Sequence, residues 1–488
     1  MPSFAINVFK LLTGSVIAQG LVVISTPIIT RFYLPDVFGI AALFTSITSV
    51  IATVSCLQYE LAIMLPKDDD DAANILCLSI CIVLLVSVLC ALAVYFSGSF
   101  LVTVIDSSEL KPFVGLLPFA VFFTGILIPL NQWSSRIKKF GNISIAQVSA
   151  ATVAQAGKLS AGFAGYTTSG ALIGSNILGL LIAPVVLGIQ VWKGHKRLFL
   201  SSINIDKMIE GLKRYKNFPL YSTWSVLLNS ASTHLPIIIL AVYFPPSVVG
   251  FYALGRAVLG IPMSLIGRSI ANVFYQKASD VHGHSGNLSA VVQEVFKRLV
   301  SLGMFPILML IFIGKDLFVI VFGSQWAEAG IYVQILAIWI LFQFISSPIS
   351  ALISVLEKQR SGLIFNMLLF ATRAASLIVG GISGNIQFTL VIFAITGAAC
   401  YGLLSLWLIS KADMHLGNAF SQIGKYCIIS SPFLILILLA KWVWGVQETG
   451  VLLLSFSSLF VYYIHVVWQD KELRKIPYAI LRRFDCIR

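Results

Sequence analysis

Long apolar runs separated by short polar segments follow one another along almost all of the 488 residues. Each run is about twenty residues long, which is the length that a helix needs to cross roughly 30 Å of hydrocarbon. Barrel strands would be about half as long and would alternate in polarity. We therefore predict an all-α polytopic membrane protein with about fourteen transmembrane helices. Their cores are residues 9–30, 38–58, 74–96, 113–133, 142–165, 170–191, 219–243, 248–272, 299–322, 330–354, 361–382, 386–409, 427–445 and 450–468.

Composition and the placement of charge support a multi-pass protein of the inner (plasma) membrane. Hydrophobic residues make up 58% of the chain, charged residues only 11%, and the mean hydropathy is +0.92. Phe9 to Thr30 lacks a small-residue cleavage site and exceeds a signal-peptide core, so we expect it to remain as a helix. Lys and Arg concentrate in every second loop and in the C-terminal tail, which predicts that both termini are cytoplasmic. Topology and anionic lipid then account for the net charge of +13 without a nucleic-acid partner.

One stretch of the chain occurs twice. YLPDVFGIAAL at Tyr33–Leu43 joins predicted helices 1 and 2, and YFPPSVVGFYAL at Tyr243–Leu254 joins helices 7 and 8. An offset of six helices predicts two lobes related by a parallel repeat, with helices 13 and 14 left over. Chance is the competing interpretation, because Gly and Pro are common in membrane helices. The predicted divisions are an N-terminal lobe (1–192), a cytoplasmic connector (193–218), a C-terminal lobe (219–410) and helices 13 and 14 with a basic tail (411–488).

Both copies of the repeat contain glycine and follow a proline-containing helix, which marks candidate conformational residues. Pro27 and Pro236 lie shortly before the two copies, and prolines in membrane helices free backbone carbonyls near transport paths. Gly39 and Gly250 are the equivalent glycines, and glycine permits close approach of one chain segment to another. We expect these four residues to act in bending or in close packing.

Ionisable residues inside the predicted spans are almost all cationic. Lys158, Arg256, Arg268 and Arg373 lie within predicted helices 5, 8, 8 and 11, and His234 lies within helix 7. Glu60 and Asp316 fall near helix ends, where we expect water to reach them. Each cation could snorkel or bond a freed carbonyl, but four of them without an acid at comparable depth favour a path for an anionic ligand. His234 is the candidate for coupling to a proton gradient, although a packed histidine is the competing interpretation.

Other residue types exclude several classes of protein. The seven cysteines lie in predicted spans or in the tail, so they imply no disulfide framework, and without partner histidines they predict no metal site. The loops are too short for an enzymatic domain, and the longest, Trp192–Pro219, has room for an amphipathic connector. The acidic run Asp68–Asp71 is expected to solvate a loop and favour a helix N-terminus rather than bind a cation. We predict a protein that is not an enzyme and has no cofactor.

Four further motifs carry a resemblance to a known family. They are P-x-x-F-G at Pro35–Gly39, YELAIMLPKDDDDAAN at Tyr59–Asn74, QWSSRIKKFGNIS at Gln132–Ser144 and FGSQWAEAG at Phe322–Gly330. In their order and helix positions they resemble the polysaccharide-transporter branch of the multidrug/oligosaccharidyl-lipid/polysaccharide (MOP) flippase superfamily, which includes O-antigen flippases. The likeness spans nearly the whole chain.

The resemblance implies a V-shaped bundle of two lobes around a central cavity that opens alternately to each side. It implies export of an undecaprenyl-pyrophosphate-linked oligosaccharide for O-antigen, capsule or exopolysaccharide, with membrane lipid and other glycan-assembly proteins as partners. The residues alone indicate a parallel-repeat transporter with a cationic path, which agrees with a pyrophosphate substrate. Coupling to a proton or a sodium gradient is compatible with the sequence.

Three alternatives stay open at this point. A multidrug exporter of the same superfamily would carry organic cations and should have buried carboxylates in its path. An O-antigen polymerase should have a sizeable outer loop with catalytic residues. A non-transporting scaffold for glycan assembly would have little reason to keep cations inside the membrane.

Overall fold

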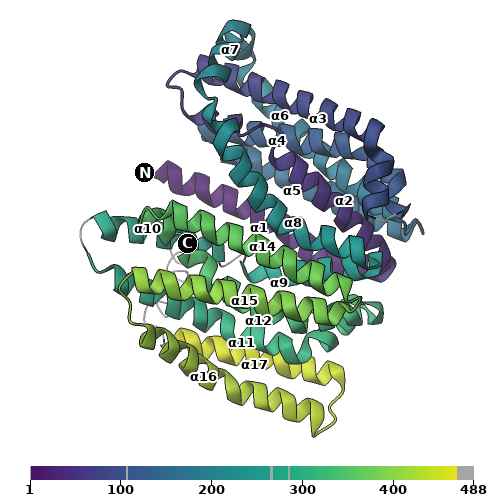
Figure 1. Cartoon of the computed structure of the whole chain (residues 1–488), viewed down its shortest axis with the longest axis vertical. Helices are drawn as coiled ribbons and strands as arrows, with labels where there is room; N and C mark the ends of the chain where they lie inside the picture. The colour runs from purple at the N-terminus through teal and green to yellow at the C-terminus, as the bar shows by residue number, and fades with distance from the viewer. Residues whose placement is uncertain (1, 106–107, 264–266, 284–285, 470–488) are drawn as a thin grey trace, which may run out of the picture. The chain divides into compact units, whose positions relative to one another are not determined.

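Helices account for nearly all of the residues that the structure describes. The structure, a computed structural model, describes residues 2–105, 108–263, 267–283 and 286–469, and within these ranges no strand occurs. Figure 1 shows long helices running side by side within each part of the chain. The prediction of an all-α polytopic membrane protein is therefore confirmed.

The predicted count of fourteen transmembrane helices is not confirmed. Among the described residues, twelve helical segments are long and apolar enough to cross a membrane. The two predicted spans that fall short are 142–165 and 248–272. The first forms one helix, α5 (Phe140–Phe163), whose apolar content is diluted by Gln147, Gln155 and Lys158. The second includes residues 264–266, which lie outside the described residues, and the described helices on either side, α9 (Pro246–Pro262) and α10 (Arg268–Gly283), are each too short to be counted as a span.

The chain forms two compact units, residues 1–253 and 254–488, with the boundary inside α9. The other helices of unit 1 are α1 (Pro2–Phe32), α2 (Pro35–Thr53), η1 (Tyr59–Met64), α3 (Asp69–Ile105), η2 (Ser108–Leu116), α4 (Leu117–Arg136), α6 (Ser169–Ser202), α7 (Ile205–Arg214), η3 (Phe218–Ser222) and α8 (Thr223–Tyr243). Unit 2 contains α11 (Leu288–Phe322), η5 (Ser324–Trp326), α12 (Ala327–Ile349), α13 (Leu352–Val355), α14 (Gln359–Ile382), α15 (Ile386–Lys411), α16 (Leu416–Trp442) and α17 (Glu448–Gln469). The lobes inferred from the repeat stay a prediction.

Two of the apolar clusters in unit 1 hold most of its helices together. Tyr33, Phe44 and Leu117 belong to one, where the Tyr33 hydroxyl donates to the Lys158 carbonyl oxygen at 2.9 Å and so ties the end of α1 to α5. Trp133 belongs to the other and is fully buried beside Phe199, with 5.2 Å between ring centroids. Both clusters are built from residues spaced along single helix faces, the pattern of packed helices.

The chain between α2 and α3 is not a regular helix. Leu57 and Gln58 adopt left-handed conformations, with φ of 48° and 62°, before the short helix η1. Arg136, the last residue of α4, closes over the following loop: its Nη1 donates to the carbonyl oxygens of Ile63 and Pro66, both at 2.9 Å, and its guanidinium lies 2.9 Å from the Asp69 carboxylate. The motifs at 59–74 and 132–144 therefore form one structural element.

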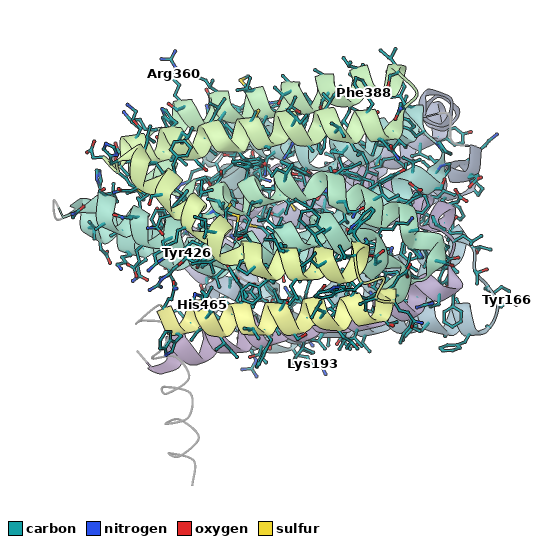
Figure 2. All side chains as sticks on the ribbon, turned by 90° about the horizontal axis from the view of Figure 1, so that it is seen from below. Tyr166, Lys193, Arg360, Phe388, Tyr426 and His465 are labelled. Carbon is teal, nitrogen blue, oxygen red and sulfur yellow. The ribbon has the colours of Figure 1, made fainter. Side chains whose placement is uncertain are left out.

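Unit 2 packs α12 and α15 around large buried side chains. Trp326, Tyr332 and Trp339 are among them. The Tyr462 hydroxyl of α17 donates to the Ser301 carbonyl oxygen of α11 at 2.7 Å, which holds the two helices together. Figure 2 shows Arg360, near the start of α14, and Phe388, near the start of α15, at opposite ends of these antiparallel helices.

Candidate functional site

Two of the sequence-predicted cations meet at one aromatic ring in unit 2. The guanidinium carbon of Arg256 lies 4.9 Å from the ring centroid of Trp339, and that of Arg373 lies 5.7 Å from the same ring. The negative face of an indole attracts a cation, and the attraction grows when water is excluded. Trp339 is 1% exposed and Arg373 is 5% exposed, so this cluster lies in the interior. Three helices, α9, α12 and α14, supply its three members.

The indole of Trp339 fits because α15 offers no side chain at the point of contact. A Cβ on Gly397 would lie 2.5 Å from Cδ1 of Trp339, so any larger residue would displace the ring. Phe393, one helical turn earlier, packs edge-on against Trp339 with 4.9 Å between centroids. The ring on which both arginines meet is thus fixed by α15.

Tyr401 of α15 connects the arginine pair to further polar groups. Nη2 of Arg373 and Nε2 of Gln343 each lie 3.3 Å from the Tyr401 hydroxyl oxygen and donate to it. The Ser346 hydroxyl donates to the Tyr401 carbonyl oxygen at 2.6 Å. These contacts place neutral hydrogen-bonding groups beside Arg373 and Tyr401.

A cavity of about 170 Å³ lies against this cluster. Arg256, Pro262, Met263, Ile340, Gln343 and Phe344 contribute to its lining. One cation and one amide therefore face a mainly apolar space, which suits an anionic group attached to apolar or neutral parts of a molecule. The volume is smaller than that of pockets for drug-sized ligands, so the cavity can take only part of a large substrate.

The remaining predicted cations and His234 lie in unit 1 or have a side chain outside the described residues. Lys158 is half-buried on α5 and belongs to unit 1. Arg268 begins α10, and its side chain lies outside the part of the chain that the structure describes. His234 is half-buried on α8 in unit 1. The roles assigned to these three residues stay predictions.

The expectation that water reaches Glu60 and Asp316 is wrong. Glu60 is 5% exposed and Asp316 is 7% exposed. Asp316 is buried because Nζ of Lys441 on α16 lies 2.6 Å from its carboxylate. Glu60 belongs to η1 and its side chain is buried, and this burial raises its pKa to about 7. The irregular chain before η1 turns this side chain inward, which helix counting could not foresee.

The two copies of the repeated stretch lie against each other. Both α2 and α9 begin at the proline of their copy, Pro35 or Pro246. A Cβ on Gly39 would overlap the Pro246 carbonyl oxygen, and a Cβ on Gly250 would overlap the Pro35 carbonyl oxygen. The expected close approach is thus present, and it is reciprocal. The other two conformational candidates lie within helices, Pro27 in α1 and Pro236 in α8.

Sequence reasoning missed Trp339, Gln343 and Tyr401. An aromatic residue in an apolar run has no feature that distinguishes a cation-binding ring from an ordinary core residue. Gln343 was the available signal, because a polar amide in the run IWILFQFI needs a hydrogen-bond partner in the interior. Among the described residues, no group of three or more His, Cys, Asp or Glu side chains could hold a metal ion.

Comparisons with known proteins place this geometry in context. The sequence pattern of the family described as polysaccharide biosynthesis protein matches residues 28–331. No curated protein sequence matches the chain.

The fold is similar to that of several solved transporters. A lipid II flippase MurJ in an inward closed conformation superimposes with a TM-score of 0.72 and 14% sequence identity, covering 99% of this chain and all of that one. An inward-facing multidrug resistance MATE family transporter of the MOP superfamily gives 0.63 and 14%, covering 81% and 95%. A MOP superfamily transporter from Pyrococcus furiosus gives 0.51 and 13%, covering 84% and 96%.

Proposed function

The chain belongs to the polysaccharide biosynthesis protein family, a family of transporters rather than enzymes, and on that premise we propose that it is a flippase for a lipid-linked glycan. The substrate would be an undecaprenyl-pyrophosphate-linked oligosaccharide repeat unit of O-antigen, capsule or exopolysaccharide. Transport would run from the cytoplasmic to the outer face of the inner membrane by alternating access. The MOP-superfamily fold supports the transport mechanism, and the substrate is inferred from the chemistry of the site.

The observation that carries this proposal is the meeting of Arg256 and Arg373 at Trp339. Each guanidinium carbon lies within 6 Å of the Trp339 ring centroid; Arg373 and the ring are buried, and Arg256 is half-buried and lines the cavity. Like charges so placed repel each other, and a diphosphate bound between or beside them relieves that repulsion. Arginine also offers paired N–H donors that match phosphate oxygens.

In the proposed mechanism the diphosphate contacts these arginines while the polyprenyl chain stays in lipid. The sugars would occupy the central cavity that the family resemblance implies. Lys158 and Arg268 would provide further contacts along the path, so that binding is spread over several sites and release stays feasible. His234 would exchange a proton if transport is coupled to a proton gradient. Other glycan-assembly proteins would supply and consume the substrate.

The test replaces Arg256 and Arg373 in turn by Ala, Gln, Lys and Glu. Surface polysaccharide is measured by complementation, with membrane abundance checked by blot. We expect Ala and Gln to abolish export, Lys to keep part of it because charge survives, and Glu to be worst. The exposed Arg360 on α14 is the matched control, since its Ala variant should export normally. Full activity of well-expressed Ala or Gln variants at both sites would end the diphosphate proposal.

Drug export by the same fold is the second candidate function, favoured by the similarity to a MATE transporter. Such a protein would move organic cations, which the arginine pair would repel. Cells expressing the chain should therefore gain no resistance to cationic dyes. Resistance that survives Arg373→Gln would favour drug export instead.

The conformational candidates have a separate test. Because α2 and α9 touch at Gly39 and Gly250, we propose that this contact changes during transport, with Pro27 and Pro236 allowing α1 and α8 to bend. Gly39→Val and Gly250→Val should reduce export more than abundance. An equal loss of both would assign the glycines to folding alone.

Orientation is tested by labelling single cysteines in intact cells with an impermeant reagent. A cysteine at Thr167, in the loop between α5 and α6, should react, and one at Lys213 should not. Arg482 in the tail, which lies outside the described residues, should also be protected. Figure 2 places Tyr166, next to Thr167, at one end of its helices. The reverse labelling pattern would overturn the proposed orientation.

A further inference from the structure

The segment between α6 and α8 carries large apolar side chains that face outward although it is not a membrane span. α6 bends at His195, where φ is −134° and ψ is 17°, and then continues to Ser202. Leu200 and Ile203 near its end are exposed, at 68% and 44%. The short helix α7 follows at the end of unit 1, as Figure 1 shows.

α7 has one broad apolar side, and its two edges have different surroundings. Met208 and Tyr215 point inward and pack against Tyr59, Leu78 and Ile82. Ile205, Ile209 and Leu212, spaced four and three residues apart, share the second edge. Their exposed fractions are 71%, 47% and 43%. The first edge therefore belongs to the core, and the second, which we call the outer face of α7, does not.

Specific contacts fix the direction in which this outer face points. The Tyr59 hydroxyl donates to the Leu212 carbonyl oxygen at 2.9 Å, and Nζ of Lys207 donates to the Asp71 carboxylate at 2.9 Å. The Asn74 amide donates to the Ser202 carbonyl oxygen, and the Asn204 backbone N–H donates back to Asn74, both at 2.8 Å. α7 is thus held at both ends, and its outer face is a fixed surface.

Basic residues flank this surface in the sequence, and the acidic residues Asp68 and Asp71 lie on the side of α7 where Lys207 pairs with Asp71. Exposed basic side chains lie on both sides of it in sequence, and they are Lys193, Lys196, Arg197, Lys213, Arg214 and Lys216. The acids of α7 itself are Asp206 and Glu210, on the polar side of the helix. Trp192, 48% exposed, lies where α6 approaches its bend, and tryptophan favours the interface between lipid and water.

We propose that the outer face of α7, with the exposed cations beside it, binds an anionic phospholipid surface. The apolar side chains would enter the boundary between headgroups and acyl chains, and the lysines and arginines would contact the headgroup phosphates. Continuity with α6 identifies the occupant as lipid, because Leu178, Val185 and Ile189 of that membrane-spanning helix are also exposed. A protein that docked on the outer face of α7 would have to do so at the level of the lipid headgroups, where it would compete with lipid.

The proposal is independent of the transported substrate and is tested on the full chain in vesicles. A variant without its native cysteines receives one cysteine, by Ile209→Cys, and an environment-sensitive nitrobenzoxadiazole label. Glu210→Cys, the adjacent residue on the polar side of the helix, is the matched control. Vesicles of phosphatidylcholine alone are compared with vesicles containing one quarter phosphatidylglycerol, with a spin label placed near the lipid headgroups as quencher.

We expect the emission of the label at position 209 to shift to shorter wavelength. Spin-labelled lipid should quench this label at least about twofold more strongly than the label at position 210. Phosphatidylglycerol should increase this quenching, and Lys213→Gln combined with Lys216→Gln should remove the increase. Equal access of aqueous iodide to both positions would overturn the proposal. Equal quenching with and without phosphatidylglycerol would overturn it too. So would protection of position 209 from iodide in detergent, because protein and not lipid would then cover the label.

Discussion

Cations have different surroundings in the loop after η1 in unit 1 and at Trp339 in unit 2. In unit 1, Arg136 is enclosed by backbone carbonyls and the Asp69 carboxylate, and Lys207 pairs with Asp71. In unit 2, Arg256 and Arg373 lie against an aromatic ring, and Arg373 also bonds a phenol hydroxyl. Carboxylates neutralise a cation and hold the fold, whereas rings and hydroxyls position it and keep its charge. We propose that the surroundings of a cation separate structural from functional charge better than its depth does.

The largest expected effect tests the structural side of this comparison. Arg136→Ala removes donors to the carbonyl groups of Ile63 and Pro66 and to Asp69, and should cost about 3 kcal/mol or more of stability. We expect a lower melting temperature in detergent and reduced abundance, with Lys restoring only part of both. Arg360→Ala should melt like the parent protein. A stable Arg136→Ala variant that fails only in transport would break the comparison.

Glu60 offers the next effect, because its buried carboxyl group has a pKa raised from 4.5 to about 7 by burial. The folded state then binds more protons than the unfolded state between these values, so stability should fall as pH rises from about 4.5 to about 7 and stay level above it. Glu60→Gln removes the ionisation and should raise stability at pH 8 by up to about 3 kcal/mol.

The measurement for Glu60 is melting temperature against pH for the parent protein and for Glu60→Gln. Glu448→Gln, an exposed acid at the start of α17, is the control and should leave the pH profile unchanged. A parallel profile for Glu60→Gln and the parent protein would show that the carboxyl group titrates as it does in water.

A substitution at Trp339 tests the functional side of the comparison. Trp339→Phe keeps a ring but weakens the attraction for both guanidinium groups, so export should fall about threefold to tenfold with a modest change in stability. Trp133→Phe in unit 1 is matched in burial, and its ring packs against His195 and Phe199 rather than arginines. It should cost similar stability and leave export per molecule unchanged. Equal export in the two variants would remove the ring from the proposed mechanism.

The smallest effect is expected at Lys207. Its ion pair with Asp71 is about half-exposed on both sides, and such pairs contribute little to stability because water and salt screen them. The hydrogen bond and the charge of Asp71 raise the pKa of Lys207. Lys207→Ala should therefore lower the melting temperature only slightly, and the difference should vanish in high salt. A large loss would place Lys207 with Arg136 as a major structural contact.

The sequence predicted the helical class, the acidic helix start and the cations, but not their partners. α3 begins at Asp69 as the acidic run indicated, because carboxylates favour a helix N-terminus. Which distant cations meet that run depends on how α4 and α7 pack, and local patterns do not encode this. The same limit applies to Trp339. The sequence marks Arg256 and Arg373 because charges inside a membrane are costly, whereas the ring that both contact resembles any buried aromatic residue. The span count is not confirmed at α5, where Gln and Lys lower the apolar signal, and at 248–272, which includes residues outside the described part of the chain.

The reciprocal contact of Gly39 with Pro246 and of Gly250 with Pro35 also bears on ancestry. When residue i of one copy meets residue j of the other and j meets i, the arrangement is that of an isologous interface. A duplicated half of the chain would form such a contact as a symmetric homodimer. In this chain the two glycines occupy separate positions that can mutate independently but must still fit each other.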